Sequence, residues 1–552
     1  MRSGAEPARI WCVGDWARID PLTGRVLESD IPPDTLRQSN EIWDGGHALV
    51  VLKGVRNEFL SFQIVIEALE SGLRDLFVSA QDLEGPARLD AARHVQFFRE
   101  IYLPLDGGMV PDALWPMDTG GSRPASITDP DRGPSEPHLV VVWVDVYIPK
   151  AIPPGVYESV FRISHRGGYR LSEFTVRLEV LEPTLPDSVS LDTILMSDGP
   201  VRTQPFTERE FHRAAHAHRS TFAIHPLLPD GSLLQGAAPV LRGVGDRISV
   251  ASWTQWDERF GPLLDGSAFH DLPRGSLPVS RFFLPFGLDY PSSFRHWGTD
   301  QYELENRTIL TEFIYHIAQK GWIEPTFIIR YQSAKRYGFY PLDLEDPVDE
   351  ADIEALLSLA AIMRTPMQSH PGVHAILWLD YAVRENSGAT LEKLRDSFDV
   401  FAIHAEKGLD DPERIGAKKD FEFWLRCPTG GVADTFQNVH DYPWIAWQRN
   451  IRGLCFQNTV DWTNGVSPGS VVSERESSPL FYYSRSESGL DGPVVSMRLK
   501  ALRRGLQDYE LLELASQRKG VEAVRDFVRS VVPCPPLKWH EQRSGLLALV
   551  VK

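Results

Sequence analysis

The chain of 552 residues has few cysteines, a deficit of basic residues and no long apolar run. Its four cysteines form no CxxC pair, so the sequence supports neither a zinc site nor a redox pair. The net charge of −18 argues against nucleic acid and against an anionic membrane as partners. No run approaches the roughly 18 apolar residues of a membrane span. The first residues lack the apolar core of a signal peptide, so we expect a cytoplasmic protein. We expect no metal and no cofactor.

The length exceeds what one hydrophobic core of about 250–300 residues supports, so several domains are expected. From about residue 42 to residue 180 apolar and polar residues alternate, as in 173–180, which predicts half-buried strands. An antiparallel β-sandwich follows from such strands. Two prolines in LEPTLPDSVSL mark the end of this part. We predict a lead-in (1–40), a β-sandwich (41–184), a barrel (185–518) and a C-terminal appendage (519–552).

Beyond residue 185 the pattern changes to short apolar segments that alternate with amphipathic helices. We predict strands at 191–197, 220–227, 279–286, 325–331, 373–381, 399–405, 421–427 and 453–459. Eight strand–helix units favour a closed parallel barrel. An open doubly wound sheet is the alternative, but no GxGxxG turn follows the first strand. The predicted fold class is multidomain β and α/β: an N-terminal β-sandwich followed by a (β/α)8 TIM-like barrel.

Several segments, in order, resemble glycoside hydrolase family 123. They are VRNEFLSFQIVIEA (55–68), PDALWPM (111–117), IPPGVYESVFRI (152–163), LEVLEPTLPDSVSLDT (178–193), FHRAAHAHR (211–219) and GPVVSMRLKALRRGLQDYELL (492–512). Because most of these segments are structural, the resemblance is more specific for the architecture than for the activity. It implies a glycoside hydrolase that removes β-linked N-acetylgalactosamine.

The resemblance also implies an Asp-Glu-Pro motif after the fourth barrel strand. In that family an adjacent Asp-Glu pair orients the 2-acetamido group of the substrate, which is the nucleophile, and supplies the acid. No Asp-Glu-Pro follows residues 325–331 in this chain. The nearest likeness is Glu345-Asp346-Pro347, in which the order of the two acids is reversed.

Three interpretations of the catalytic carboxylates stay open. In the first, Glu345 is the acid and Asp346 the orienting group. In the second, both merely favour the start of the helix that follows Pro347, because acidic residues are common there. In the third, the pair comes from two other strands, with Asp380 ending the fifth and Glu406 ending the sixth, since glycoside cleavage ordinarily uses two carboxylates.

Other polar and aromatic residues follow the predicted strands and would line the same mouth of the barrel. As substrate-binding residues we predict Asp198, His225, Asp289, Tyr290, Tyr331, His404, Gln457, Asp461 and Trp462. Carboxylates can bind sugar hydroxyls, and aromatic rings can stack on sugar faces.

The sequence therefore favours a carbohydrate-active protein that acts as a glycoside hydrolase on a carbohydrate substrate. The alternative is a barrel that no longer hydrolyses sugar and serves as a glycan-binding or assembly component. The sugar, the linkage and the oligomeric state are not given by the sequence.

Overall fold

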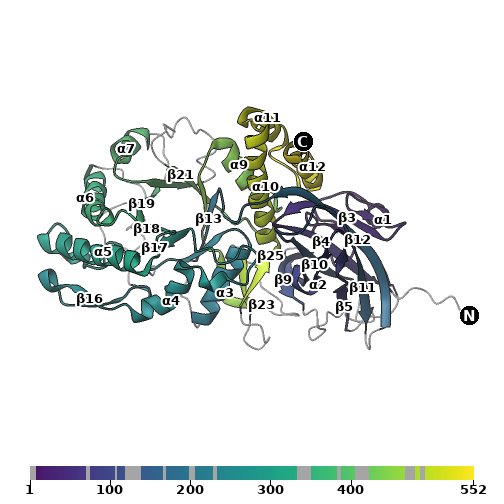
Figure 1. Ribbon diagram of the computed structural model, residues 1–552, viewed down its shortest axis with the longest axis horizontal. Coiled ribbons are helices and arrows are strands. Elements are labelled where there is room, and N and C mark those ends of the chain that lie inside the picture. Colours follow the sequence, from purple (N-terminus) through teal and green to yellow (C-terminus); the bar gives the residue numbers. More distant parts are fainter. Residues whose placement is uncertain are drawn as a thin grey trace, which may run out of the picture. The chain divides into compact units, whose positions relative to one another are not determined.

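The computed structural model describes residues 8–69, 75–105, 108–117, 139–165, 169–197, 205–227, 233–331, 350–381, 387–404, 422–466, 479–484 and 492–551. The chain divides into two compact units, and Figure 1 labels many of their elements. The first unit comprises Met1–Asp187, Gly430–Gln448 and Thr463–Lys552, and the second comprises Ser188–Thr429 and Arg449–Trp462. None of the described helices is both long and apolar enough to cross a bilayer.

The first unit is built on two β-sheets. One has the order β1-β4-β10-β8-β9-β25-β24-β23. Its strands are β1 (Ala8–Gly14), β4 (Glu58–Ala68), β8 (Val95–Leu105), β9 (Gly108–Pro116), β10 (Leu139–Ile148), β23 (Val460–Val466), β24 (Phe481–Ser484) and β25 (Pro493–Ser496). The other sheet contains β2 (Trp43–Asp44), β3 (Leu49–Arg56), β5 (Phe77–Ala80), β6 (Leu83–Glu84), β7 (Arg88–Leu89), β11 (Gly155–His165) and β12 (Tyr169–Thr184).

The two sheets of the first unit face each other across a shared core. The ring of Phe161 on β11 lies 5.9 Å from that of Phe62 on β4 and 6.0 Å from that of Phe97 on β8. The expectation of purely antiparallel sheets is wrong at one pairing, because β3 and β12 run parallel. These two strands are far apart in the chain, so no tight hairpin forces them to be antiparallel.

The second unit contains an eight-stranded parallel sheet of order β14-β13-β22-β21-β20-β19-β18-β17. The strands are β13 (Asp192–Ser197), β14 (Thr221–Ile224), β17 (Arg281–Phe283), β18 (Thr326–Tyr331), β19 (His374–Tyr381), β20 (Val400–His404), β21 (Glu422–Cys427) and β22 (Gly453–Phe456). The eight predicted strands are confirmed. The first, β13, pairs with the last, β22. Between β14 and β17 the hydroxyls of Thr221 and Ser280 lie 3.2 Å apart, so the sheet is a nearly closed barrel.

Helices connect the strands of the second unit. They are α3 (Pro205–Ala217), α4 (Thr254–Leu264), α5 (Asp300–Lys320), α6 (Glu350–Met367) and α7 (Ser387–Leu394), and a hairpin of β15 (Val240–Arg242) and β16 (Ser249–Ser252) precedes α4. The ends of α5 show why the sequence forms a helix there. The Thr299 hydroxyl accepts a hydrogen bond from the Tyr302 amide at the start, and Gly321 ends the helix with a φ of 75°.

The helices of the first unit are α1 (Pro33–Gln38), α2 (Ala91–His94), α9 (Gln437–Arg449), α10 (Met497–Lys519), α11 (Val521–Val531) and α12 (Trp539–Val551). Helix α10 begins at Ser496, whose hydroxyl accepts a hydrogen bond from the Leu499 amide. The predicted domain 185–518 included this helix, whereas the structure places it in the same compact unit as the N-terminal sheets. The helix contacts α11, α12, β9 and β25, which belong to that unit.

Candidate functional site

The interior of the parallel sheet is an apolar cluster to which every strand contributes. It contains Ile194, Met196, Ala223, Phe283, Ile328, Trp378, Val400, Ala402, Trp424 and Cys455. In a strand, residues two apart point to the same face. The residues two positions beyond Ile328, Trp378, Ala402, Trp424 and Cys455 therefore point to the interior at the carboxyl ends of the strands. These are Arg330, Asp380, His404, Arg426 and Gln457, which we call the polar layer.

Asp380 lies at the centre of the contacts within the polar layer. Its Oδ1 accepts a hydrogen bond of 2.6 Å from the indole nitrogen of Trp378, and its Oδ2 accepts one from Arg330 Nη2. Arg426 Nη1 lies 3.9 Å from the same Oδ2, and Arg426 Nη2 donates to Gln457 Oε1 at 3.0 Å. Side chains from β18, β19 and β21, and from the end of β22, are thus linked around one carboxylate.

The environment of Asp380 keeps this carboxyl group charged. Burial raises the pKa of Asp380, which is only 1% exposed. The guanidinium groups of Arg330 and Arg426 and the two hydrogen bonds lower it by more than burial raises it. The pKa of Asp380 is therefore below its ordinary value. A carboxylate of this kind is ionised at neutral pH, so it can stabilise or orient positive charge but cannot donate a proton.

The two arginines of the polar layer were not predicted as site residues from the sequence. Each is a charged residue within an apolar strand segment, TFIIRY for Arg330 and EFWLRC for Arg426. A charged residue in such a segment is itself a signal, because a charged side chain is rarely buried without a partner. The register of β19 and β18, which pairs Trp378 with Arg330, brings the partners together.

His404 and Gln457, both predicted from the sequence, belong to the polar layer. His404 is exposed at the end of β20 and pairs in register with Arg426 on β21. His225, two residues beyond Ala223, is buried, and its Nδ1 lies 2.8 Å from the carbonyl oxygen of Leu227.

Tyr331, Tyr290 and Asp289 lie in other surroundings. Tyr331 comes one residue after Arg330 and so points to the opposite face of β18, where its ring meets that of Phe398. Burial raises the pKa of Tyr331 and of Tyr290. Asp289 is exposed, and its Oδ1 accepts a hydrogen bond of 2.7 Å from the Phe294 amide, so it fixes a turn after β17.

The remaining predicted site residues fall where the structure gives no side-chain description. Asp198, Glu345, Asp346 and Glu406 lie outside the described residues. Asp461 and Trp462 belong to β23, but their side chains are also outside the described part. Within that part, no three His, Cys, Asp or Glu side chains are grouped as a metal site.

At the opposite end of the strands a second ionic group closes the interior. Arg281 donates to Asp192 Oδ2 at 2.6 Å, and its guanidinium lies over the ring of Trp424 at 5.4 Å. In barrels of this kind, the working residues lie at the carboxyl ends of the strands. The polar layer around Asp380 is therefore the candidate site.

Comparison with protein-family models gives no match, and comparison with curated proteins gives none either. Among solved structures, a family 123 glycoside hydrolase from Clostridium perfringens has a TM-score of 0.64 at 12% identity, with 99% of this chain and 97% of that chain covered. The fold is that of this hydrolase. The predicted resemblance to family 123 is thus confirmed in architecture.

Other solved structures are less similar. An endo-β-1,4-mannanase from Thermotoga petrophila has a TM-score of 0.35 at 9% identity over 59% of this chain and 77% of that chain. A β-glucuronidase from Bacteroides uniformis has a TM-score of 0.32 at 12% identity, covering 78% of this chain and 47% of that chain. These scores carry no further argument.

Proposed function

We propose that the chain is a carbohydrate-active protein, a glycoside hydrolase that binds its substrate at the carboxyl ends of a (β/α)8 barrel. The observation that carries this proposal is the polar layer, in which a buried, ionised Asp380 is held between arginines at that edge. The fold shared with a family 123 glycoside hydrolase supports the choice of reaction. A terminal N-acetylhexosaminide is the first substrate to test, and the reaction needs only water as co-reactant.

In this proposal Asp380 acts as an ionised carboxylate that stabilises positive charge, and it does not donate the proton. Positive charge develops on the sugar ring as the glycosidic bond breaks, and a fixed carboxylate stabilises it. Arg330 and Trp378 position Asp380 by occupying one of its oxygens each. The proton for the leaving oxygen comes from a second carboxyl group, for which Glu345, Asp346 and Glu406 are the candidates.

The first experiment measures hydrolysis of aryl N-acetylgalactosaminide and of a panel of other aryl glycosides. Asp380→Asn is expected to lower kcat/KM by about 100-fold or more, because a fixed negative charge that stabilises the positively charged transition state is lost. Asp192→Asn is the matched control, since Asp192 also pairs with an arginine of the barrel interior but at the other end. Full activity in Asp380→Asn would refute the assignment.

The second experiment identifies the acid among Glu345→Gln, Asp346→Asn and Glu406→Gln. A variant that lacks the acid is expected to keep most activity on aryl glycosides with good leaving groups and to lose it on alkyl glycosides. If all three variants affect both substrate types equally, none of these residues is the acid.

The alternative function is a glycan-binding or assembly component without hydrolysis. One observation favours it: within the polar layer, Asp380 is the one carboxylate among the described side chains. Binding of glycans by the intact chain without release of a reducing sugar, and loss of that binding in Asp380→Asn, would select this alternative.

A further inference from the structure

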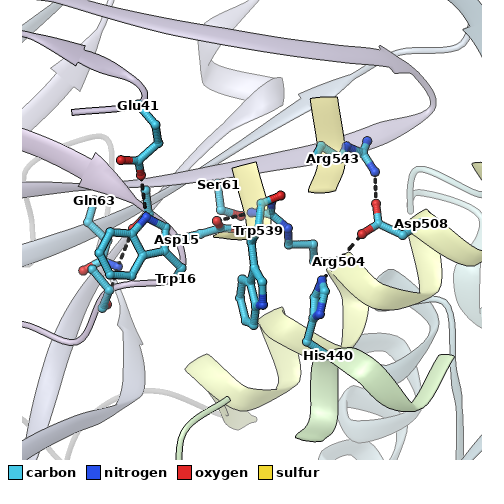
Figure 2. A network of polar contacts seen from close by, with 12 residues as sticks. Asp15, Trp16, Glu41, Ser61, Gln63, His440, Arg504, Asp508, Trp539 and Arg543 are labelled. Atoms are coloured by element: carbon cyan, nitrogen blue, oxygen red, sulfur yellow. Dashed lines mark hydrogen bonds and ion pairs between the residues drawn. The ribbon is translucent and has the colours of Figure 1, made fainter. Parts of the chain in front are cut away.

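The first unit contains a cavity of about 80 Å³ that the proposed hydrolase reaction does not use. On one side it is lined by Asp15, Trp16, Glu41 and Ser61, close to strands β1 and β4. On the other side lie residues of two C-terminal helices, Arg503 and Arg504 on α10 and Arg543 and Ser544 on α12. Figure 2 shows several of these side chains together, with the helices in yellow.

The size of the cavity matches a small polar molecule. A water needs about 10–15 Å³ of cavity volume, so the cavity has room for about six waters. At roughly 30 Å³ of liquid volume per water, six waters take up about 180 Å³, which is comparable to the volume of one hexose. Exposed residues, among them Ser544 and His540 of α12, border the cavity, so a ligand can enter from solvent.

The charged groups at the wall are already paired within the protein. Arg504 Nη1 donates to Asp15, and Arg543 donates to Glu58 and Asp508, as the right half of Figure 2 shows in part. Lys500 and Arg503 both bind Asp145, with Nζ and Nη2 at 2.7 and 2.8 Å. Lys53 lies 3.1 Å from Glu179. Since each lysine and arginine at the wall has a carboxylate beside it, the cavity does not select for an anion.

The same ion pairs hold both hydrogen-bond donors and hydrogen-bond acceptors in fixed positions around the cavity. The Ser61 hydroxyl donates to Asp145 at 2.7 Å and accepts from Arg503 Nη2 at 3.1 Å. Glu41 accepts the indole N–H of Trp16 through Oε1, and the carboxylates of Glu41 and Asp15 both line the cavity. Gln507 binds both backbone groups of Phe59 at 2.9 Å, which holds α10 on β4. Such a wall is rigid before any ligand arrives, so little ordering opposes binding.

We propose that this cavity is a second, non-catalytic site that binds one neutral sugar residue. Sugar hydroxyls both donate and accept, which suits a wall where carboxylate acceptors alternate with guanidinium, ammonium and hydroxyl donors. The site lies entirely in the first unit and does not depend on hydrolysis at the barrel. It would bind a residue of a glycan through interactions separate from those of the barrel.

The test is a ligand-observed NMR titration of the full chain with methyl β-galactoside and methyl β-glucoside. Ser544→Trp fills the mouth of the cavity from an exposed helix position and breaks no hydrogen bond of the described structure. We expect it to weaken binding about tenfold or more. Val551→Trp, on the same helix and outside the cavity lining, is the matched control and should bind as the unmodified chain does.

Two further variants separate the possible outcomes. Glu41→Gln removes a carboxylate acceptor and should also weaken binding, which keeps the test valid if Ser544→Trp fails to fold. Asp380→Asn alters only the barrel and should leave this binding unchanged. Binding that persists in Ser544→Trp but is lost in Asp380→Asn belongs to the barrel and overturns the proposal, as does the absence of binding to both glycosides.

Discussion

Replacing Asp145 by asparagine should destabilise the first unit strongly. Asp145 is fully buried on β10, and its two oxygens accept five hydrogen bonds. Three come from the cations Lys500 and Arg503 on α10 at 2.7–2.9 Å. The others come from Ser61 at 2.7 Å and from the indole of Trp143 at 2.8 Å.

The Asp145→Asn substitution would remove the negative charge and turn an amide donor toward two cationic donors. Removing one partner of a buried ion pair typically costs about 3–5 kcal/mol, because the remaining charge is left uncompensated. At about 1.4 kcal/mol per factor of ten, the population in which the first unit is unfolded should rise roughly 100- to 5,000-fold. The double variant Asp145→Asn/Lys500→Met should lose less, since it removes one of the two stranded cations.

Amide hydrogen exchange with peptide resolution measures this effect unit by unit. Peptides from β10 and α10 should exchange faster, while peptides from β18 and β19 in the other unit should not change. Asp34→Asn is a suitable control, because that carboxylate is 82% exposed and pairs with Arg37 at the surface. A loss below about 1 kcal/mol for Asp145→Asn would refute the reasoning from buried charge.

Three further predictions concern buried titratable groups. Burial raises the pKa of Glu100 well above its ordinary value, so ionisation of this carboxyl group opposes folding above about pH 4.5. In thermal melts, Glu100→Leu should therefore stabilise the chain by about 1–3 kcal/mol at neutral pH and by less in acid. Burial lowers the pKa of His212 and His216 to about 3, so both rings stay neutral in the folded chain at pH values where an unfolded histidine is protonated. The free energy of unfolding should therefore fall below about pH 6.5 by up to about 1.4 kcal/mol per pH unit and histidine, and a His212→Gln/His216→Gln variant should show a shallower loss in acid denaturation. Burial opposes protonation of His440, but Asp441 and Asp508 raise its pKa above the ordinary value; His440→Gln should therefore cost more stability at about pH 6 than at about pH 9.

Each of these predictions has a result that would contradict it. For Glu100 it is an equal or larger stabilisation below about pH 4.5. For His212 and His216 it is an unchanged pH dependence in the double variant. For His440, which is stacked on Trp539 at 4.1 Å and drawn beside Asp508 in Figure 2, it is a penalty that grows with pH. A ring that merely packs would show no such dependence.

Most elements of the barrel could be predicted from the sequence because their signal is local. Segments such as 325–331 and 373–381 are short apolar runs between helices, and burial on both faces of a parallel strand produces such runs. The helix at Glu350–Met367 begins with Glu350 and Asp352, as a helix start favours. Polar residues at the strand ends, including Asp380, His404 and Gln457, were found for the same reason.

What the sequence could not decide depends on contacts between distant segments. A shift of one residue in the register of β18 would turn Tyr331 instead of Arg330 to the interior. Only the pairing of β18 with β19 determines which of the two faces it. The charge of Asp380 depends on two arginines, one on β18 and one on β21, which no local pattern relates to one another.

The sequence by itself determined the kinds of elements, their order and the family likeness, because alternation, helix starts and turns are properties of neighbouring residues. The tertiary structure decided that α10 joins the N-terminal sheets through Asp145, Lys500 and Arg503, and that Asp380 is held as an anion. Burial and ion pairing act over distances in space, so their outcome is fixed only when the strands and helices have packed.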